Sequence, residues 1–145
     1  MQKDYIDYTN SKRAPVVICF VKHDGKFLLV KRSEKVGAYK NLWSSIAGFL
    51  DDSKTASEKA TQEMEEELGI KKSEIMSIVE GPIYVFTDEK LGREWERHLV
   101  VVEISTPKIH LDWEHIDFVW ISPEEISKYE TPPGFETDLN RVKDL

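Results

Sequence analysis

Short apolar runs separated by turn signals occupy the first third of the chain. Residues 16–21 (VVICFV) are followed by the dipeptide Asp24-Gly25 and by residues 27–30 (FLLV). An Asp-Gly pair between two apolar runs is typical of a β-hairpin, and continuous apolar runs are typical of strands buried on both faces. We therefore predict two antiparallel strands, followed by a third, short strand at residues 42–47.

The spacing of apolar residues changes to that of a helix after Thr55. Thr55 with Glu58 three residues later is a capping-box pattern, and Gly69 is typical of a helix end. Apolar residues recur at intervals of four along this segment, at Ala56, Ala60, Met64 and Leu68. At about 100° per residue they form one stripe, which predicts a helix that packs by this side.

Strand-like segments resume after the helix. The predicted strands are residues 75–79, 83–86, 95–104 and 118–121, with a break at Gly81-Pro82, a turn at residues 87–93 and a loop at residues 107–115. Ser122 and Pro123 indicate the start of a short helix, and residues 135–145 are predicted to form a terminal helix. Strands on both sides of a helix predict an α/β (α+β) domain with a mixed sheet. The length of 145 residues fits one domain over residues 1–145, with residues 1–13 as a polar arm.

Three carboxylates share the flank of the predicted helix. Glu63, Glu66 and Glu67 lie within about one helical turn, beside the apolar stripe. Like charges at this spacing repel one another, and a hard divalent cation such as Mg²⁺ would remove the repulsion because it prefers oxygen ligands. A solvated acidic helix face is the alternative interpretation, since Glu is a good helix former.

Residues 48–70 resemble the signature of the Nudix hydrolase family, the Nudix box. That signature is a glycine, five residues, Glu, seven residues, and then Arg-Glu-apolar-x-Glu-Glu-x-Gly-apolar. The matching residues are Gly48, Glu63, Met64, Glu66, Glu67, Gly69 and Ile70. Three positions depart from the pattern: Ala47 replaces a glycine, Lys54 the first Glu and Gln62 the Arg.

The resemblance implies a fold and an activity. The fold is a Nudix-type α/β/α sandwich with a central mixed sheet. The activity is metal-dependent hydrolysis of a phosphoanhydride bond in a nucleoside diphosphate linked to another moiety. Mg²⁺ or Mn²⁺ is the implied cofactor. By position, Glu63, Glu66 and Glu67 are the expected catalytic residues and metal ligands, with the Gly48 carbonyl as a further ligand and Glu63 as a third carboxylate ligand or the base that activates water.

The departures from the box leave a second function open. Gln62 can still donate a hydrogen bond, but a neutral one is weaker than the charged one of an Arg. If Lys54 points inward, it either competes with Mg²⁺ for the carboxylates or binds a substrate phosphate. If it points outward, Asp51 or Asp52 supplies the missing acid. The alternative to an enzyme is therefore a Nudix-fold nucleotide-binding sensor with reduced or no catalysis.

Candidate residues outside the box follow from the resemblance and from charge. Many Nudix enzymes use an additional acid, for which Glu103 is our candidate, with Glu94 and Glu96 as alternatives. The predicted substrate-binding residues are Arg32, Lys40, Lys54 and Trp95. The competing interpretations are solvated charges for the acids and the basic residues, and a core aromatic for Trp95.

The charge of the chain limits the classes of partner that it is expected to bind. The net charge of −7 and the pI near 5.2 disfavour a nucleic acid polymer, so a small nucleotide derivative is the expected partner. The lone Cys19 is consistent with a cytoplasmic location, and no apolar segment approaches the length of a membrane span. A homodimer is compatible with the family. The four histidines show no metal-ligand spacing and are interpreted as structural or surface residues.

Overall fold

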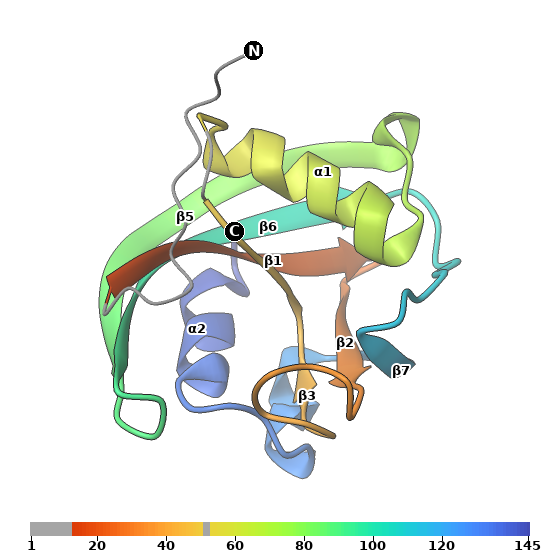
Figure 1. The fold of residues 1–145 in the computed structure, drawn as a ribbon. Helices are drawn as coiled ribbons and strands as arrows, with labels where there is room; N and C mark the ends of the chain where they lie inside the picture. The colour runs from red at the N-terminus through yellow and green to blue at the C-terminus, as the bar shows by residue number, and fades with distance from the viewer. Residues whose placement is uncertain (1–12, 51–52) are drawn as a thin grey trace.

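A mixed seven-stranded sheet forms the centre of the computed structural model, which describes residues 13–50 and 53–145 (Figure 1). The strands are β1 (Arg13–His23), β2 (Lys26–Arg32), β3 (Trp43–Ser44), β4 (Ile46–Phe49), β5 (Ile75–Asp88), β6 (Arg93–Ile104) and β7 (His115–Ile121). The sheet order is β3-β2-β1-β6-β5, while β4 also pairs with β1 and β7 with β2. The pair β1–β6 is parallel and the other pairs are antiparallel. The predicted mixed sheet is therefore confirmed.

Two helices cover opposite faces of the sheet (Figure 1). On one face, helix α1 (Ala56–Leu68) buries Ala60, Met64 and Leu68 in a core with valines of β1 and β6. On the other face, helix α2 (Phe135–Val142) buries Phe135, Leu139 and Val142 in a second core. This is the α/β/α sandwich that the resemblance implies, and the predicted apolar stripe of α1 is buried as expected.

The ends of α1 form as the sequence predicts. The Thr55 hydroxyl accepts a hydrogen bond from the Glu58 backbone N–H (3.1 Å), and the Glu58 carboxylate accepts one from the Thr55 N–H (2.9 Å). Gly69 ends the helix with φ of 68°, in the left-handed region that glycine enters without a Cβ penalty. These local bonds fix the rotation of α1 and hence the direction of its carboxylates.

Two predicted strand boundaries are wrong. Gly81-Pro82 does not break a strand, because β5 runs through it with a shift in register between Glu80 and Ile83. The predicted strand at residues 42–47 is divided at Ser45 into β3, which pairs with β2, and β4, which pairs with β1. This division carries the chain from one side of β1–β2 to the other and delivers Gly48 beside α1.

Other differences concern the ends of elements. Arg13 belongs to β1 rather than to the predicted polar arm, and the rest of that arm lies outside the described residues. The segment that starts at Pro123 is a 3₁₀-helix (Pro123–Lys128) with the expected capping box, and a second 3₁₀-helix spans Lys72–Glu74. The terminal helix ends at Val142, and His115 belongs to β7 rather than to the preceding loop.

Candidate active site

A pocket of about 750 Å³ lies beside α1 and β4. This volume is within the usual range for small-molecule sites. Its lining includes Gly48, Glu63, Glu67 and, from the segment before β7, Glu114. The pocket therefore collects carboxylates from two segments that are far apart in the sequence.

Gly48 and Glu63 are in close contact across the β4–α1 junction. A Cβ atom placed on Gly48 would lie 2.9 Å from Cδ of Glu63 and 3.0 Å from its Oε2 atom. Since Cβ atoms in proteins do not approach other heavy atoms so closely, residue 48 must be glycine for Glu63 to keep this position. The predicted pairing of these two residues in one site is therefore observed.

Glu63 and Glu67 are both buried and lie one turn apart on α1. Burial raises the pKa of Glu67 well above its ordinary value, and the hydrogen bond and charge of Glu63 raise it further. These effects favour the neutral form of Glu67, and a cation bound beside its carboxylate would favour the ionised form.

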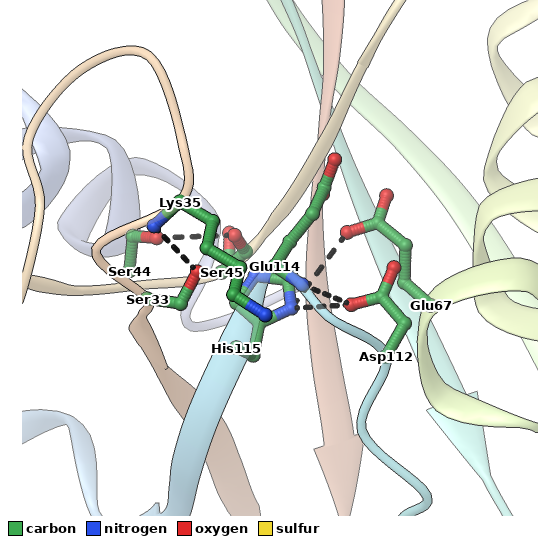
Figure 2. A network of polar contacts seen from close by, with 8 residues as sticks. All are labelled: Ser33, Lys35, Ser44, Ser45, Glu67, Asp112, Glu114 and His115. Atoms are coloured by element: carbon green, nitrogen blue, oxygen red, sulfur yellow. Dashed lines mark hydrogen bonds and ion pairs between the residues drawn. The ribbon is translucent and has the colours of Figure 1, made fainter.

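A group of potential metal ligands gathers around Glu67 (Figure 2). One ligand atom from each of Glu67, Asp112, Glu114 and His115 lies within 4.8 Å of the others. His115 Nδ1 is 3.2 Å from Asp112 Oδ1 and 4.0 Å from Glu67 Oε1, and Asp112 Oδ1 also accepts the Glu114 backbone N–H. Burial lowers the pKa of His115, which favours the neutral imidazole that binds metals.

These residues fit a divalent cation. Glu67, Asp112 and Glu114 offer carboxylate oxygens, the ligands that Mg²⁺ and Mn²⁺ prefer, and His115 adds one imidazole. Glu63 lines the pocket together with Glu67 and Glu114. The pKa of Glu67 is raised because negative charge at this buried carboxylate is unfavourable, and a bound divalent cation would compensate that charge. The donor set thus suits the cofactor that the Nudix resemblance implies.

The other predicted acids lie elsewhere. The Glu66 side chain is exposed and accepts a hydrogen bond from Gln62 Nε2 (2.8 Å). Glu103 lines a different, smaller pocket with His23 and Met76. Glu94 pairs with Arg13 and Glu96 with His98. The expectation that Glu63, Glu66 and Glu67 converge on one cleft therefore holds for two of the three.

The predicted substrate-binding residues separate into two pairs. Arg32 and Trp95 line the pocket, where Arg32 Nε donates to the Ala38 carbonyl (3.0 Å) and the Arg93 guanidinium stacks 4.5 Å from the Trp95 ring centre. Lys40 and Lys54 are exposed and lie outside the pocket lining. Asp51 and Asp52, the suggested substitutes for the first box Glu, lie outside the described residues.

Sequence reasoning missed Asp112, Glu114 and His115. All three fall within the segment predicted as a loop, residues 107–115. The antiparallel pairing of β7 with β2 places them beside the pocket, with Arg32 opposite His115. The Ser33 backbone N–H donates to the Glu114 carbonyl (2.7 Å), which fixes this approach. The only sequence signal was a group of acidic and histidine residues ahead of a strand.

Hydrogen bonds and an ion pair brace the walls of the pocket. The Tyr39 hydroxyl donates to Asp88 Oδ2 (2.6 Å), joining the β2–β3 loop to the end of β5, and burial raises the pKa of Tyr39 to about 12. Arg97 Nη1 lies 2.7 Å from Asp138 Oδ2, and the Tyr84 hydroxyl donates to the other carboxylate oxygen. These contacts hold β5, β6 and α2 around the pocket.

Comparison with known proteins agrees with the geometry. A family described as the NUDIX domain matches residues 12–141. Nucleoside triphosphatase NudI of Escherichia coli O17:K52:H18 is 22% identical over 129 residues, which cover 81% of this chain and 89% of that protein. The MutT NUDIX hydrolase of Burkholderia pseudomallei superposes with a TM-score of 0.76 at 18% identity, covering 91% of this chain and 99% of its own. A NUDIX hydrolase from Nitrosomonas europaea gives a TM-score of 0.72 at 21% identity, with 92% and 90% covered. The chain therefore belongs to the Nudix family.

Proposed function

We propose that this chain is a divalent-metal-dependent pyrophosphohydrolase that cleaves a phosphoanhydride bond in a nucleoside diphosphate derivative. The observation that carries the proposal is the convergence of Glu63, Glu67 and Glu114 on one pocket, beside the basic residue Arg32. The nucleoside triphosphatase activity named for the NudI relatives supports a nucleoside triphosphate as the first substrate to test.

The chemistry follows from the charges in the pocket. A water oxygen forms a bond to phosphorus while the anhydride P–O bond breaks, and the leaving oxygen departs on the product phosphate or nucleotide. A divalent ion held by Glu67, Glu63, Glu114 and His115, with the Gly48 carbonyl as a further predicted ligand, would neutralise charge that develops on the phosphoryl oxygens. Arg32 contacts a phosphate, and Glu63 either binds the ion or accepts the proton of the attacking water.

The remaining predicted residues keep their roles as proposals. Glu66 becomes a ligand only if its side chain leaves Gln62, and Trp95 accepts a nucleobase only on the ring face that Arg93 leaves open. Lys40, Lys54 and Glu103 would have to act from outside the pocket lining.

The domain organisation, location and partners of the chain are also proposals. We propose a single domain over residues 1–145 that works in the cytoplasm on a small nucleotide derivative rather than on a nucleic acid polymer, with a homodimer as a further prediction. Within residues 13–50 and 53–145, no helix combines the length and apolar character needed to cross a membrane.

The direct test is hydrolysis of a panel of nucleoside triphosphates and other nucleoside diphosphate derivatives. We expect release of phosphate or pyrophosphate with Mg²⁺ or Mn²⁺, and loss of turnover when the ion is chelated. Turnover that persists undiminished in chelator would contradict the proposal.

A nucleotide sensor is the second candidate function. It is favoured by the pairing of Glu66 with Gln62, which takes one signature acid away from the pocket. In that case the same panel gives no turnover with either metal, while one nucleotide binds without metal in an equilibrium titration.

We propose Glu114, in place of the sequence candidate Glu103, as the additional acid. We expect Glu114→Gln to lower turnover by about 10–100-fold, because removing an oxygen ligand or its partner at a metal site has effects of this size. Glu103→Gln should leave turnover unchanged, since Glu103 lies in the other pocket. Equal losses in the two variants, measured as initial rates at saturating Mg²⁺, would contradict this assignment.

A further inference from the structure

We propose that Lys59 is a positioning residue for Glu63 and supplies the positive charge that the Nudix signature places at residue 62. The inference rests on the proposed function, because Glu63 belongs to the proposed metal site.

Lys59 and Glu63 form a buried ion pair on α1. Lys59 Nζ lies 3.7 Å from Glu63 Oε2, and the two side chains are 10% and 9% exposed. Lysine is almost never buried unless it is paired, because the charged group loses its hydration. The contact is therefore a specific pairing rather than a solvated surface contact.

Helix stability does not explain a lysine at this position. Lys59 lies at the N-terminal end of α1, where the helix dipole disfavours a cation. The order Lys then Glu at a spacing of four is also the weaker orientation for a helical ion pair. Positions that break local rules without a local gain are expected at functional sites.

Gln62, at the signature Arg position, is directed to a different partner. Its Nε2 donates to Glu66 Oε1 (2.8 Å), on the exposed side of the helix. The positive group beside Glu63 is instead Lys59, four residues before Glu63 on the same helix. In this chain the hydrogen bond made by residue 62 and the positive charge beside Glu63 thus come from two different residues.

Lys59 and Gly48 hold the Glu63 carboxylate from two sides. The ammonium attracts Oε2, while the absence of a side chain on Gly48 leaves the space that the carboxylate fills. The same attraction opposes the repulsion between Glu63 and Glu67. Lys59 therefore keeps Glu63 beside Glu67, where both carboxylates can meet one ion.

The test is Mn²⁺ binding to the purified chain, measured by titration calorimetry without substrate. We expect Lys59→Met to raise the Mn²⁺ dissociation constant by about 10–100-fold, the usual effect of losing a residue that orients a metal ligand. Lys59→Arg keeps the charge and should bind close to wild type. Lys128→Met, which removes the exposed Lys of the Lys128–Glu125 pair, is the matched control and should have no effect.

The sign of the change separates the possible roles of Lys59. If the ammonium merely competes with the metal, Lys59→Met binds Mn²⁺ more tightly, and the proposal is overturned. Equal weakening in Lys59→Arg and Lys59→Met would overturn it as well. Absence of Mn²⁺ binding in the wild type would instead count against the proposed metal-dependent function itself.

A double-mutant cycle with Glu63→Gln makes the test independent of folding. Because Lys59 acts through Glu63, adding Lys59→Met to Glu63→Gln should cause no further loss of Mn²⁺ affinity. The double variant removes both charges of the Lys59–Glu63 pair, so it provides a second measurement if Lys59→Met alone fails to fold. Additive losses in the two variants would contradict the positioning role.

Discussion

Glu67→Gln is expected to lower turnover of a nucleoside triphosphate by about 10²–10⁴-fold, the range that removal of an essential acid–base or metal-binding group produces. Glutamine has nearly the shape of glutamate but no negative charge. The substitution therefore removes one of the buried carboxylates beside Asp112, Glu114 and His115 while preserving the packing of α1. Initial rates at saturating Mg²⁺ give the measurement.

The stability of the Glu67→Gln variant should not decrease, in contrast to its turnover. Removing one of two mutually repelling buried acids should leave the free energy of unfolding unchanged or raise it when no metal is present. Glu65→Gln is the matched control, since Glu65 is exposed on the same helix and should keep full activity. Comparable turnover in the two variants would contradict a role for Glu67 in catalysis.

Local signals predicted the part of the site that lies on α1. The capping box at Thr55 and the stop at Gly69 are each made by residues close in sequence, so the helix and its rotation could be read without the rest of the chain. Given that rotation, Glu63 and Glu67 had to face the same side. Glu66 separates from them because its neighbour four residues earlier, Gln62, offers a hydrogen-bond donor on the exposed side.

The part of the site outside α1 depends on pairing between distant strands. Glu114 reaches the pocket because β7 pairs with β2, and no pattern around residue 114 specifies that pairing. Glu103 is the candidate that the sequence analysis names for the additional acid, yet β6 carries it to the other pocket. Register between distant strands is set by the packing of the whole sheet, which is why the additional acid could not be chosen from the sequence.

The error at Gly81-Pro82 has a related cause. A proline lacks the N–H that a central strand needs, which is why the sequence predicts a break at this position. Among the strands formed by residues 13–50 and 53–145, β5 pairs only with β6 and lies at the sheet edge, where the missing donor need not face a partner. The register shift between Glu80 and Ile83 accommodates the two residues as an irregularity within one strand.

Asp138→Asn is expected to lower the free energy of unfolding by about 3–5 kcal/mol, because it leaves the buried Arg97 guanidinium without its counter-ion. The loss is large compared with the roughly 5–15 kcal/mol that holds a typical domain folded. Asp138 is fully buried, and its carboxylate accepts from Arg97 (2.7 Å) and from Tyr84. Urea unfolding of the two proteins measures the difference.

Two further variants distinguish a lost ion pair from a lost hydrogen bond. Tyr84→Phe removes the hydroxyl that donates to Asp138 and accepts from Arg97, but it keeps both charges, and it should cost about 1.5–3 kcal/mol. Arg97→Met with Asp138→Leu removes both charges, so the double variant should be less destabilised than Asp138→Asn. If Asp138→Asn lost no more stability than Tyr84→Phe, the charge of Arg97 would be compensated by its remaining contacts, the Pro133 carbonyl and the Phe86 ring. The joint between β6 and α2 would then depend on those neutral contacts rather than on the ion pair.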